Sequence, residues 1–478
     1  MDQLIYNQYR IPKDKWRYGK RPSAETGCGW IATHNALRLM DLPSEPEELI
    51  REYTRQIPLI HGNTGTSLFG LFRYFQKRNF KVDLLLRKKK FNRAVREADT
   101  AILFYRWRSK RQMGAHFVTL HSTRKGFMGY NTYRNSDGPD LYGDSLPEFL
   151  EKRKYFGPVL MTIQNPNQTT KKEERPMILV IGSINMDVNI LLETILQPGQ
   201  TQLCRQAVFK SPGGKGANQA VAAAKLGAEV VMLGCVGKDA DGEKMLSSLQ
   251  NAGVNTDYIL VKEDCPTSTA YINVAASGEN AIAVDPTANL HVSADYVRAH
   301  PELFAKADYC VFQLEIPIDT VKAAKALCRK YNVKTVLNPS PANGRTKELL
   351  SGIDYLIPNE TEAAALLGKP YEEATDGDWQ AFLEKNDIGH MVITLGADGC
   401  QYRQAGKEPV HYPTRERQAV DTCGAGDTFL GGFVTALSEG KTEADAIDFA
   451  ATAAGIQITR SGAQAAMPTR AEVEADMV

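Results

Sequence analysis

Residues 419–432 read AVDTCGAGDTFLGG and place Asp427 directly after the small residues Gly424, Ala425 and Gly426. Small residues allow backbone N–H groups to converge on an anion, and a helix that begins there adds a partial positive charge. The apolar run that follows favours such a helix. A carboxylate at this position either takes part in phosphate chemistry or only caps the helix, because Asp is a preferred N-cap residue. This stretch by itself leaves both interpretations open.

A second glycine-rich stretch, SPGGKGANQA at residues 211–220, follows a polar segment, GSINMD at residues 182–187. Each comes after a strand-like run, and ligands of open α/β sheets bind beyond the carboxyl ends of the strands. Asp and Asn side chains beside a glycine turn suit the hydroxyl groups of a polyol. The alternative is a tight turn that merely enters a helix. The candidate polyol residues of the two stretches are Asn185, Asp187, Gly213, Gly214, Lys215 and Asn218.

The segment PNETEA at residues 358–363 holds a candidate metal site. Asn359 and Glu362 are three positions apart, so both side chains can face one side of a first helical turn. Mg²⁺ prefers oxygen ligands and keeps several waters, so one indirectly placed carboxylate is enough. The same spacing also predicts a capping box between these two residues.

The N-terminal third contains a cysteine, a histidine and an asparagine in the order of a nucleophile, a base and an orienting residue. Cys28 precedes an amphipathic helical pattern, and a helix N-terminus stabilises a thiolate. His116 and Asn131 lie on two predicted strands, and they meet Cys28 only if the strands pair as a hairpin. His34 and His121 are competing bases, but His34 lies nearly two turns along the same helix. The alternative is a buried helix cysteine and a structural strand histidine.

The chain of 478 residues is long enough for two or three domains. Residues 165–176 are polar and contain two prolines, which is typical of a linker, so we expect domains at 1–164 and 177–478. In the second domain short β-branched runs alternate with helical patterns, which indicates a parallel sheet covered on both faces. Two pieces with alternating apolar character, at 188–210 and 267–284, predict a small accessory sheet.

The distribution of charge along the chain and the pattern of cysteines indicate the class of partner and the cellular compartment. Residues 1–165 contain 29 Lys and Arg against 16 Asp and Glu, whereas the remainder contains 28 against 40. The two parts therefore carry charges of +13 and −12. The eight cysteines form no CxxC pair, which indicates reduced thiols in the cytoplasm. No apolar run reaches the roughly 20 residues that span a bilayer, so we expect no membrane insertion. The basic runs RKKKFNRAVR and RWRSKRQ match no nucleic-acid module, so an acidic partner is favoured over RNA or DNA.

From Met177 to the C-terminus the motifs, in this order, resemble the ribokinase family of sugar kinases. The resemblance implies a Rossmann-like α/β sheet with a small β lid. It implies that Asp427 is the catalytic base, which takes the proton of a primary hydroxyl as that hydroxyl attacks the γ-phosphate of ATP. The N–H groups of Gly424, Ala425 and Gly426 would form the anion hole. Phosphoryl transfer depends mostly on positioning and charge stabilisation, which explains why base and anion hole are neighbours.

The resemblance also assigns the binding residues. The sugar would be surrounded by Asn185, Asp187, Gly213, Gly214, Lys215, Asn218 and Asp427, with Glu315 nearby. The nucleotide and Mg²⁺ would be bound by Asn359, Glu362, Thr394, Gly396, Gly399 and Gly426. A K⁺ ion would lie beside the anion hole, held by oxygens of Asp421, Cys423 and the turn at 460–464, including Arg460 and Gly462. The accessory strands would act as a lid and as a homodimer interface.

One segment departs from this family. Family members that use ribose commonly have a small Gly-Ala-Asn turn where this chain reads DPTAN, residues 285–289. Pro286 fixes its backbone dihedral and removes a donor, so the contact of the lid with the sugar differs. Ribose is the leading substrate, and a nucleoside or another pentose is the alternative.

Residues 1–164 are similar to papain-like cysteine peptidases of the C39-like type, which implies an α+β fold and a Cys28, His116 and Asn131 site. That family usually has a Gln six residues before the nucleophile, where this chain has Pro22. The Cys28 amide and an earlier residue such as Gln8 are candidate replacements. We therefore expect a bifunctional protein, a sugar kinase fused to a cysteine hydrolase. The alternative is a kinase with a non-catalytic binding or regulatory N-terminal domain.

Overall fold

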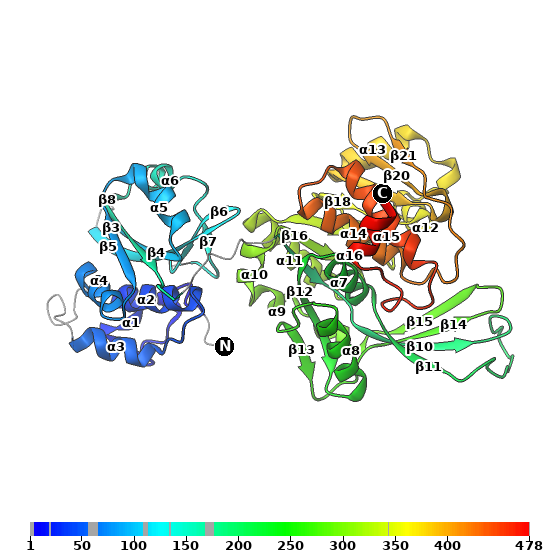
Figure 1. Ribbon diagram of the computed structural model, residues 1–478, viewed down its shortest axis with the longest axis horizontal. Coiled ribbons are helices and arrows are strands. Elements are labelled where there is room, and N and C mark those ends of the chain that lie inside the picture. The colour runs from blue at the N-terminus through cyan, green and yellow to red at the C-terminus, as the bar shows by residue number, and fades with distance from the viewer. Residues whose placement is uncertain are drawn as a thin grey trace. The chain divides into compact units, whose positions relative to one another are not determined.

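A computed structural model describes residues 4–18, 21–55, 66–108, 113–132, 135–167, 176–342 and 344–477. The chain folds into two compact units, Met1–Glu174 and Arg175–Val478. The expected linker at 165–176 falls largely outside the described residues. Each unit has its own hydrophobic core, and each is described by itself (Figure 1).

The N-terminal unit is an α+β unit built on an antiparallel sheet of six strands in the order β3-β8-β4-β5-β6-β7. These strands are β3 (Lys81–Leu85), β4 (Thr100–Arg108), β5 (Met113–Thr123), β6 (Gly126–Tyr130), β7 (Asp140–Leu141) and β8 (Phe156–Gln164), beside a small pair β1 (Arg17–Tyr18) and β2 (Arg21–Pro22). The helices are η1 (Gln8–Arg10), α1 (Ser23–Thr26), α2 (Cys28–Leu39), α3 (Pro46–Arg55), α4 (Leu68–Gln76), η2 (Lys88–Lys90), α5 (Phe91–Glu97) and α6 (Leu146–Lys152).

Helix α2 packs on one face of this sheet and is buried on all sides from Gly29 to Leu37. Ile31 and Ala32 are fully buried and share a core with Phe117 of β5. The Thr119 hydroxyl donates to the Ala32 carbonyl at 2.9 Å, which ties α2 to the same strand. Strands β5 and β6 pair antiparallel as the predicted hairpin. The N-terminus of α2 therefore lies against the strand that carries His116.

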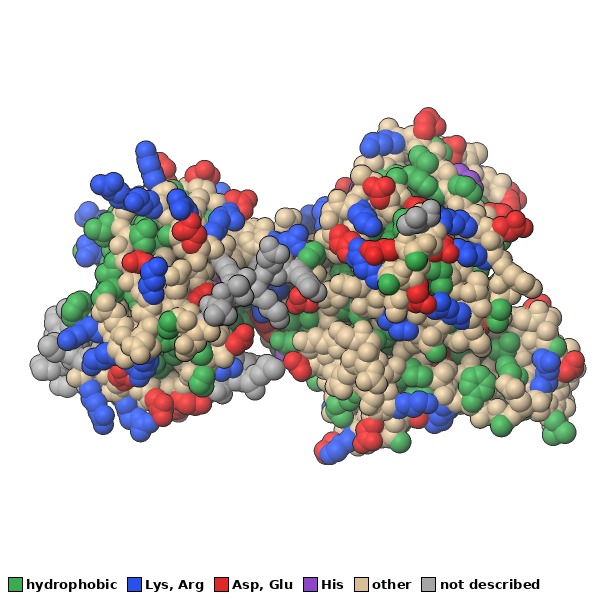
Figure 2. Space-filling model, viewed as in Figure 1, with side chains coloured by type: hydrophobic (Ala, Val, Ile, Leu, Met, Phe, Trp, Pro, Cys, Tyr) green, Lys and Arg blue, Asp and Glu red, His purple; other side chains and the backbone are tan. Residues whose placement is uncertain are grey.

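The basic run at 87–96 forms η2 and α5 with its apolar side chains inward. Phe91 and Val95 are buried, whereas Lys88, Lys89 and Lys90 are exposed. Figure 2 shows Lys and Arg side chains over the part of the unit where β3, α5 and α6 lie. This run forms the solvated face of a short helix.

The C-terminal unit is an α/β fold around a nine-stranded sheet in the order β13-β12-β9-β16-β17-β18-β19-β20-β21. The first seven strands of that order are parallel, and β20 and β21 continue antiparallel. They are β9 (Met177–Ile181), β12 (Glu229–Gly237), β13 (Ile259–Lys262), β16 (Tyr309–Phe312), β17 (Lys334–Leu337), β18 (Tyr355–Leu356), β19 (His390–Thr394), β20 (Cys400–Gln404) and β21 (Val410–Tyr412).

Helices cover this sheet as the alternating pattern predicts. One core cluster joins the sheet to α7 (Lys215–Lys225), α8 (Ala240–Asn251), α14 (Ala425–Ser438), α15 (Glu443–Gln457) and α16 (Arg470–Met477). The remaining helices are η3 (Thr287–His291), α9 (Ala294–Arg298), α10 (Pro301–Lys306), α11 (Ile318–Tyr331), η4 (Thr346–Leu349), α12 (Glu360–Leu367), η5 (Tyr371–Glu373), α13 (Asp376–Asn386) and η6 (Gly396–Asp398). Within the described residues no helix is both long and apolar enough to cross a membrane.

The order of the strands creates a crevice at the centre of the sheet. The chain runs from β9 outward through β12 to β13 and then returns to the other side of β9 as β16. Such a reversal of strand order is the usual ligand-binding position in open α/β sheets. Residues 182–187 follow β9, and Glu315 follows β16, so both flank this crevice.

The accessory sheet expected from the sequence is present. It consists of β10 (Asn185–Leu191), β11 (Phe209–Gly213), β14 (Thr269–Val274) and β15 (Asn280–Asp285) in the order β11-β10-β14-β15. Figure 1 shows these strands reaching away from the main sheet of their unit. Asn185 and Gly213 pair across β10 and β11, so the base of this sheet adjoins the crevice.

Candidate active site

The glycine turn at 424–426 is the N-terminal end of α14. Gly424 is the N-cap residue and adopts φ 82°, a left-handed conformation that favours glycine. The Ala425 N–H donates to the Thr422 carbonyl at 3.2 Å, which closes the turn. A Cβ placed on Gly426 would meet no heavy atom within 4 Å, so the backbone there is open to a ligand. Open backbone at a helix N-terminus suits an anion.

Asp427 lies in the first turn of α14 and is held by two amide side chains of α7. Asn218 Nδ2 donates to Oδ2 at 3.0 Å, and Gln219 Nε2 donates to Oδ1 at 2.9 Å. Burial raises the pKa of the Asp427 carboxyl, and Lys215 together with the two amides opposes that rise. Its side chain does not cap α14, so the capping interpretation of Asp427 is wrong. The carboxylate instead points to the polyol residues.

The polyol residues lie in one polar cluster. The Ser183 hydroxyl donates to Glu315 Oε2 at 2.5 Å, and Asn185 Nδ2 reaches the same oxygen at 3.4 Å. Asn185 is itself oriented by Asn289, whose Nδ2 donates to Asn185 Oδ1 at 2.8 Å. Asn289 belongs to the DPTAN segment and is fully buried. Through Asn289, the DPTAN segment therefore positions Asn185, a candidate sugar-binding residue.

Three carboxylates and one ammonium group face each other in this cluster. Burial, followed by the charges of Glu315 and Asp427, raises the pKa of Asp187 to about 7. Lys215 opposes this rise and has its own pKa raised by the surrounding carboxylates, although burial lowers it. A carboxyl group that titrates near neutral pH inside a cleft is a functional-site signal.

Two glycines allow the backbone to close over the cluster. Gly213 lies so near Asp187 that a Cβ would come within 2.0 Å of Oδ2. Gly214 has φ 88°, and a Cβ there would come within 2.6 Å of the Asn185 nitrogen. Glycine is therefore required at 213 and 214 because Asp187 and Asn185 approach the backbone there too closely for a Cβ atom. The alternative of a turn that merely enters a helix does not explain this requirement.

A cavity of about 350 Å³ adjoins the N-terminal end of α14. The expected nucleotide residues Thr394, Gly396, Gly399 and Gly426 line it, together with Ala425 and Phe429. Further lining residues come from the segment 414–422 and from α15. The apolar lining suits a flat base, and the open helix terminus suits a phosphate.

Asn359 and Glu362 form a capping box at the start of α12. Asn359 Oδ1 accepts from the Glu362 N–H at 2.8 Å, and Glu362 Oε2 accepts from the Asn359 N–H at 3.0 Å. The other Glu362 oxygen has no hydrogen bond from any described residue. The charge of Glu362 contributes to raising the pKa of Lys215, so this carboxylate lies within electrostatic range of the cluster. Among the described residues no group of three His, Cys, Asp or Glu side chains is placed to hold a metal ion.

The residues expected to hold K⁺ are joined to each other by hydrogen bonds. Asp421 Oδ1 accepts from the Cys423 N–H at 2.9 Å, and Oδ2 accepts from the Gly462 N–H at 2.9 Å. Gln457 Nε2 donates to the Cys423 carbonyl at 2.7 Å and to the Gly462 carbonyl at 3.3 Å. Arg460 instead donates to Glu472 at 2.6 Å. The Gln457 amide therefore donates hydrogen bonds to two carbonyl oxygens that were assigned to the cation.

In the N-terminal unit the predicted trio is brought together in part. The Phe117 N–H points at the Cys28 sulfur, so the thiol lies against β5 at Phe117, the residue that follows His116 in the sequence. His116 Nε2 lies 2.5 Å from the Asn131 carbonyl oxygen. The Asn131 side chain points elsewhere, because its Nδ2 donates to Gln8 at 3.1 Å and its Oδ1 accepts from the Gln8 N–H at 2.9 Å. Asn131 thus orients the histidine through its backbone, and the expected side-chain contact is not formed.

The pKa shifts of Cys28 and His116 favour the neutral form of both side chains. Burial raises the pKa of the Cys28 thiol to about 11, against the backbone N–H groups of Phe117, Cys28 and Gly29. Burial also lowers the pKa of His116. No hydrogen bond joins the thiol to His116 in the described structure. Gln8 Nε2 donates to the Ala24 carbonyl at 3.2 Å, so its amide is held near the helix that precedes Cys28.

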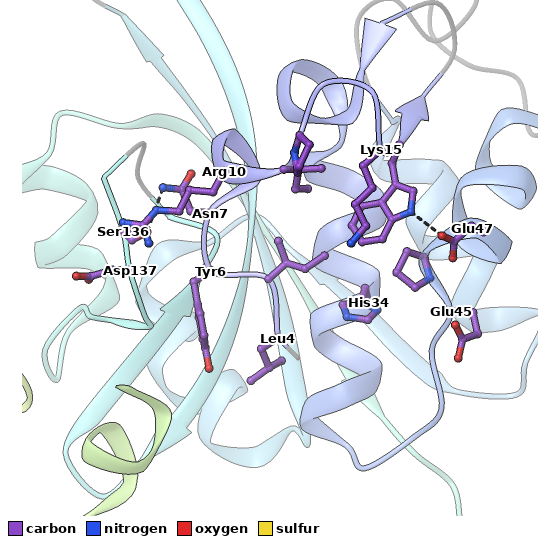
Figure 3. A pocket seen from close by; sticks show the side chains of 15 residues that line it. Leu4, Tyr6, Asn7, Arg10, Lys15, His34, Glu45, Glu47, Ser136 and Asp137 are labelled. Carbon is purple, nitrogen blue, oxygen red and sulfur yellow. Dashed lines mark hydrogen bonds between the residues drawn. The ribbon is translucent and has the colours of Figure 1, made fainter. Parts of the chain in front are cut away.

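A cavity of about 680 Å³ lies elsewhere in this unit, along the N-terminal segment (Figure 3). Tyr6, Lys15 and Trp16 line it, and Trp16 Nε1 donates to Glu47 at 2.6 Å. His34 also faces this cavity, with Nδ1 2.9 Å from the Ser44 hydroxyl. The described residues that line it include neither Cys28 nor His116. His34 therefore belongs to a different part of the unit from Cys28.

Sequence reasoning missed three residues of the kinase half: Ser183, Gln219 and Gln457. Each is fully or almost fully buried, and each bonds a group of the site. The available signal was a polar residue within an otherwise apolar helical run, as in AVAAAKL after Gln219 and in AATAAGI before Gln457. Buried polar side chains need partners, so such positions indicate a hydrogen-bond network.

The sequence comparisons identify the C-terminal unit. Residues 175–470 match the pfkB family of carbohydrate kinases. Ribokinase from Haemophilus influenzae is 42% identical over 299 residues, which are 62% of this chain and 97% of that protein. Ribokinase from Bacillus subtilis is 40% identical over 298 residues, 62% of this chain and 98% of that protein.

The structure comparison agrees. The structure of Arabidopsis thaliana ribokinase complexed with ribose and ATP superposes with a TM-score of 0.56 at 31% identity, and covers 63% of this chain and 98% of that one. The fold of the C-terminal unit is therefore the ribokinase-like α/β fold, as expected. The chain belongs to the pfkB family of carbohydrate kinases, and its C-terminal unit is a sugar kinase.

Proposed function

We propose that the C-terminal unit transfers the γ-phosphate of ATP to the primary hydroxyl of D-ribose and forms D-ribose 5-phosphate. The observation that carries this proposal is the position of Asp427. Its carboxylate faces the polyol cluster, while the open backbone of Gly426, one residue earlier, lines the nucleotide cavity. Relatives at 42% and 40% identity bear the name ribokinase, and a solved relative is described with ribose and ATP.

In the proposed mechanism Asp427 accepts the proton of the sugar hydroxyl as that oxygen attacks the phosphorus. Asn218 and Gln219 keep both carboxylate oxygens oriented, and Lys215 stabilises the negative charge of the cluster. The N–H groups at the start of α14 stabilise the charge that develops on the transferred phosphoryl group. Removing a donor of this kind typically costs about a hundredfold in rate.

Asp187, Asn185 and Glu315 are proposed to bind the sugar hydroxyl groups, since they supply carboxylate and amide oxygens within one cluster. Glu362 is proposed to hold Mg²⁺ through water with the oxygen that its capping box leaves unbonded. When bound, Mg²⁺ neutralises charge on the phosphate oxygens. The capping box keeps Glu362 in place for this role.

ADP release with a panel of pentoses, hexoses and nucleosides tests the assignment. We expect ribose to give the highest kcat/KM. The variant Asp427→Asn should lose about a hundredfold to ten-thousandfold in kcat, the usual contribution of a general base. The matched control Asp319→Asn changes an exposed carboxylate on α11 and should retain full activity. A nucleoside with a higher kcat/KM than ribose contradicts the sugar assignment, and full activity of Asp427→Asn contradicts the role of the base.

For the N-terminal unit we propose a cysteine hydrolase activity, supported by the position of Cys28 at the start of α2 against β5, and by the contact of His116, on β5, with the Asn131 carbonyl. If Nε2 donates to the Asn131 carbonyl, the proton of His116 is fixed there and Nδ1 is left as a base. His116 would take the thiol proton as sulfur attacks an acyl carbon. The Cys28 N–H, at the start of α2, would stabilise the resulting oxyanion.

An acyl-directed thiol probe tests this activity. Labelling of Cys28 should disappear in Cys28→Ala and fall strongly in His116→Ala, whereas His34→Ala should label normally. Circular dichroism of each variant shows whether the fold is retained. Equal labelling of the His116→Ala and wild-type proteins would show that the unit is a binding or regulatory module.

We also propose that the kinase units pair through the accessory sheet. Ile282 and Val284 of strand β15 are 55% and 40% exposed and, being two positions apart, lie on the same face of the sheet. Exposed apolar residues that share a face are typical of interaction surfaces. Light scattering of wild type and of the variant Ile282→Lys should show a dimer and a monomer, respectively. A cytoplasmic location is part of the proposal, because none of the described cysteines is joined to another in a disulfide.

A further inference from the structure

The Gln457 side chain is buried at the C-terminal end of α15, between the loop that leads into α14 and the turn at 460–462. Its Nε2 atom donates one hydrogen bond to each segment, 2.7 Å to the Cys423 carbonyl and 3.3 Å to the Gly462 carbonyl. A side-chain amide has two N–H donors, so both are used. The two carbonyl oxygens fix the amide orientation, because an amide oxygen facing them would be repelled.

Asp421 completes the arrangement from the opposite side. Its two carboxylate oxygens accept the N–H groups of Cys423 and Gly462, each at 2.9 Å. The N–H and C=O groups of both residues are thus satisfied by two side chains, one an acceptor and one a donor. These backbone groups are partly buried, and the protein pairs all four of them itself.

A monovalent cation at this place would need the same carbonyl oxygens. The site that the family resemblance predicts for K⁺, at Asp421, Cys423, Arg460 and Gly462, therefore does not fit this chain. The Gln457 Nε2 atom lies 2.7 Å from the Cys423 carbonyl oxygen and 3.3 Å from the Gly462 carbonyl oxygen, so it takes the position of a cation that would bridge these two oxygens.

We infer that the Gln457 amide replaces the monovalent cation and makes the kinase independent of K⁺. The inference rests on the proposed kinase function for its activity assay. Gln457 connects α15 to the residue before Gly424, which caps α14, so it holds the anion-binding turn. It does so as a positioning residue, because it touches the loop and not the transferred group. Ala463 packs against Gly424 from the same turn and supports this connection.

Activity with saturating ATP and ribose should be the same in K⁺ and in tetramethylammonium at equal ionic strength. A K⁺ activation below about twofold corresponds to a negligible coupling free energy. In Gln457→Ala the Cys423 and Gly462 carbonyls lose their donor, so the rate without K⁺ should fall about tenfold or more. K⁺ should restore much of it, because the vacated space is lined by carbonyl and carboxylate oxygens. Gln457→Lys supplies an ammonium donor and should remain indifferent to K⁺.

Thermal unfolding gives a readout that does not depend on activity. KCl should raise the Tm of Gln457→Ala above its value in tetramethylammonium chloride and leave the wild-type Tm unchanged. The control Thr452→Ala removes a buried hydroxyl from α15 that bonds only its own helix, and it should show no K⁺ effect. A wild-type protein whose rate and Tm both rise with K⁺ would overturn the inference. Absence of kinase activity in every salt would overturn the proposed function, and the unfolding data would still decide the cation question.

Discussion

The hydrogen bond from Gln219 to Asp427 allows a quantitative test of the base. Gln219 Nε2 lies 2.9 Å from Oδ1, and its own Oε1 accepts from Gln313 Nε2 at 2.5 Å. The hydrogen bond from Gln313 therefore fixes the orientation of the Gln219 amide, so that its Nε2 atom faces the Asp427 carboxylate. Gln219→Met keeps the length and volume of the side chain and removes only the amide.

The size of the effect follows from the burial of Asp427. A hydrogen bond to a charged group is worth about 1.5–3 kcal/mol, and one pKa unit corresponds to about 1.4 kcal/mol. Removing the donor should raise the pKa of Asp427 by about one to two units. Asp427 acts as a base only when ionised, so activity is lost as the pH falls through its pKa. The acid limb of kcat/KM should therefore move to higher pH.

The assay is kcat/KM for ribose as a function of pH, with kcat measured in parallel. We expect the shifted acid limb together with a fall in kcat of about tenfold, because the carboxylate also loses its orientation. Gln250→Met, on the exposed surface of α8, is the matched control and should give the wild-type profile. An unshifted limb in a folded Gln219→Met protein would refute the assignment of Asp427 as a base tuned by α7.

Three further predictions concern other parts of the molecule. Because Asp187 has a pKa of about 7, ribose affinity by calorimetry should weaken as the pH falls below neutrality, and Glu315→Gln should move this loss to lower pH. Gly431→Ala should lower the free energy of unfolding in urea by about 1–3 kcal/mol, because a Cβ there would lie 2.5 Å from α7, whereas Gly344→Ala faces open space and should change little. Alkylation of Cys28 by iodoacetamide should increase up to a pH of about 11, and a midpoint near neutrality would contradict the burial of the thiol.

The alternation of strands and helices predicted the architecture of the C-terminal unit. Strand β9, for example, is buried on both faces and reads as a continuous apolar run, which is typical of a central parallel strand. The hairpin of β5 and β6 was also predictable from two apolar runs joined by a short turn. The strand order, with β9 at the centre, was not, because non-local pairing leaves no pattern in the sequence.

Chemistry at the site was predictable where the spacing is local. The capping box of Asn359 and Glu362 follows from a separation of three residues, and the turn at Gly424 follows from its glycine. The contact of Asn218 with Asp427 joins residues 209 positions apart and needed the fold. The family resemblance supplied that pairing, but it also predicted K⁺ beside Cys423, where this chain places an amide.

The residue types available for chemistry, the glycines that permit close backbone approach and the order of the elements can all be read from the amino-acid sequence. The contacts between distant groups come from the fold: the Gln457 amide on the Cys423 carbonyl, the Asn131 carbonyl rather than its side chain on His116, and the burial that raises the pKa of Asp187 to about 7. The physical reason is that hydrogen bonds and desolvation depend on distance in space, whereas sequence spacing fixes distance only within one helix or turn.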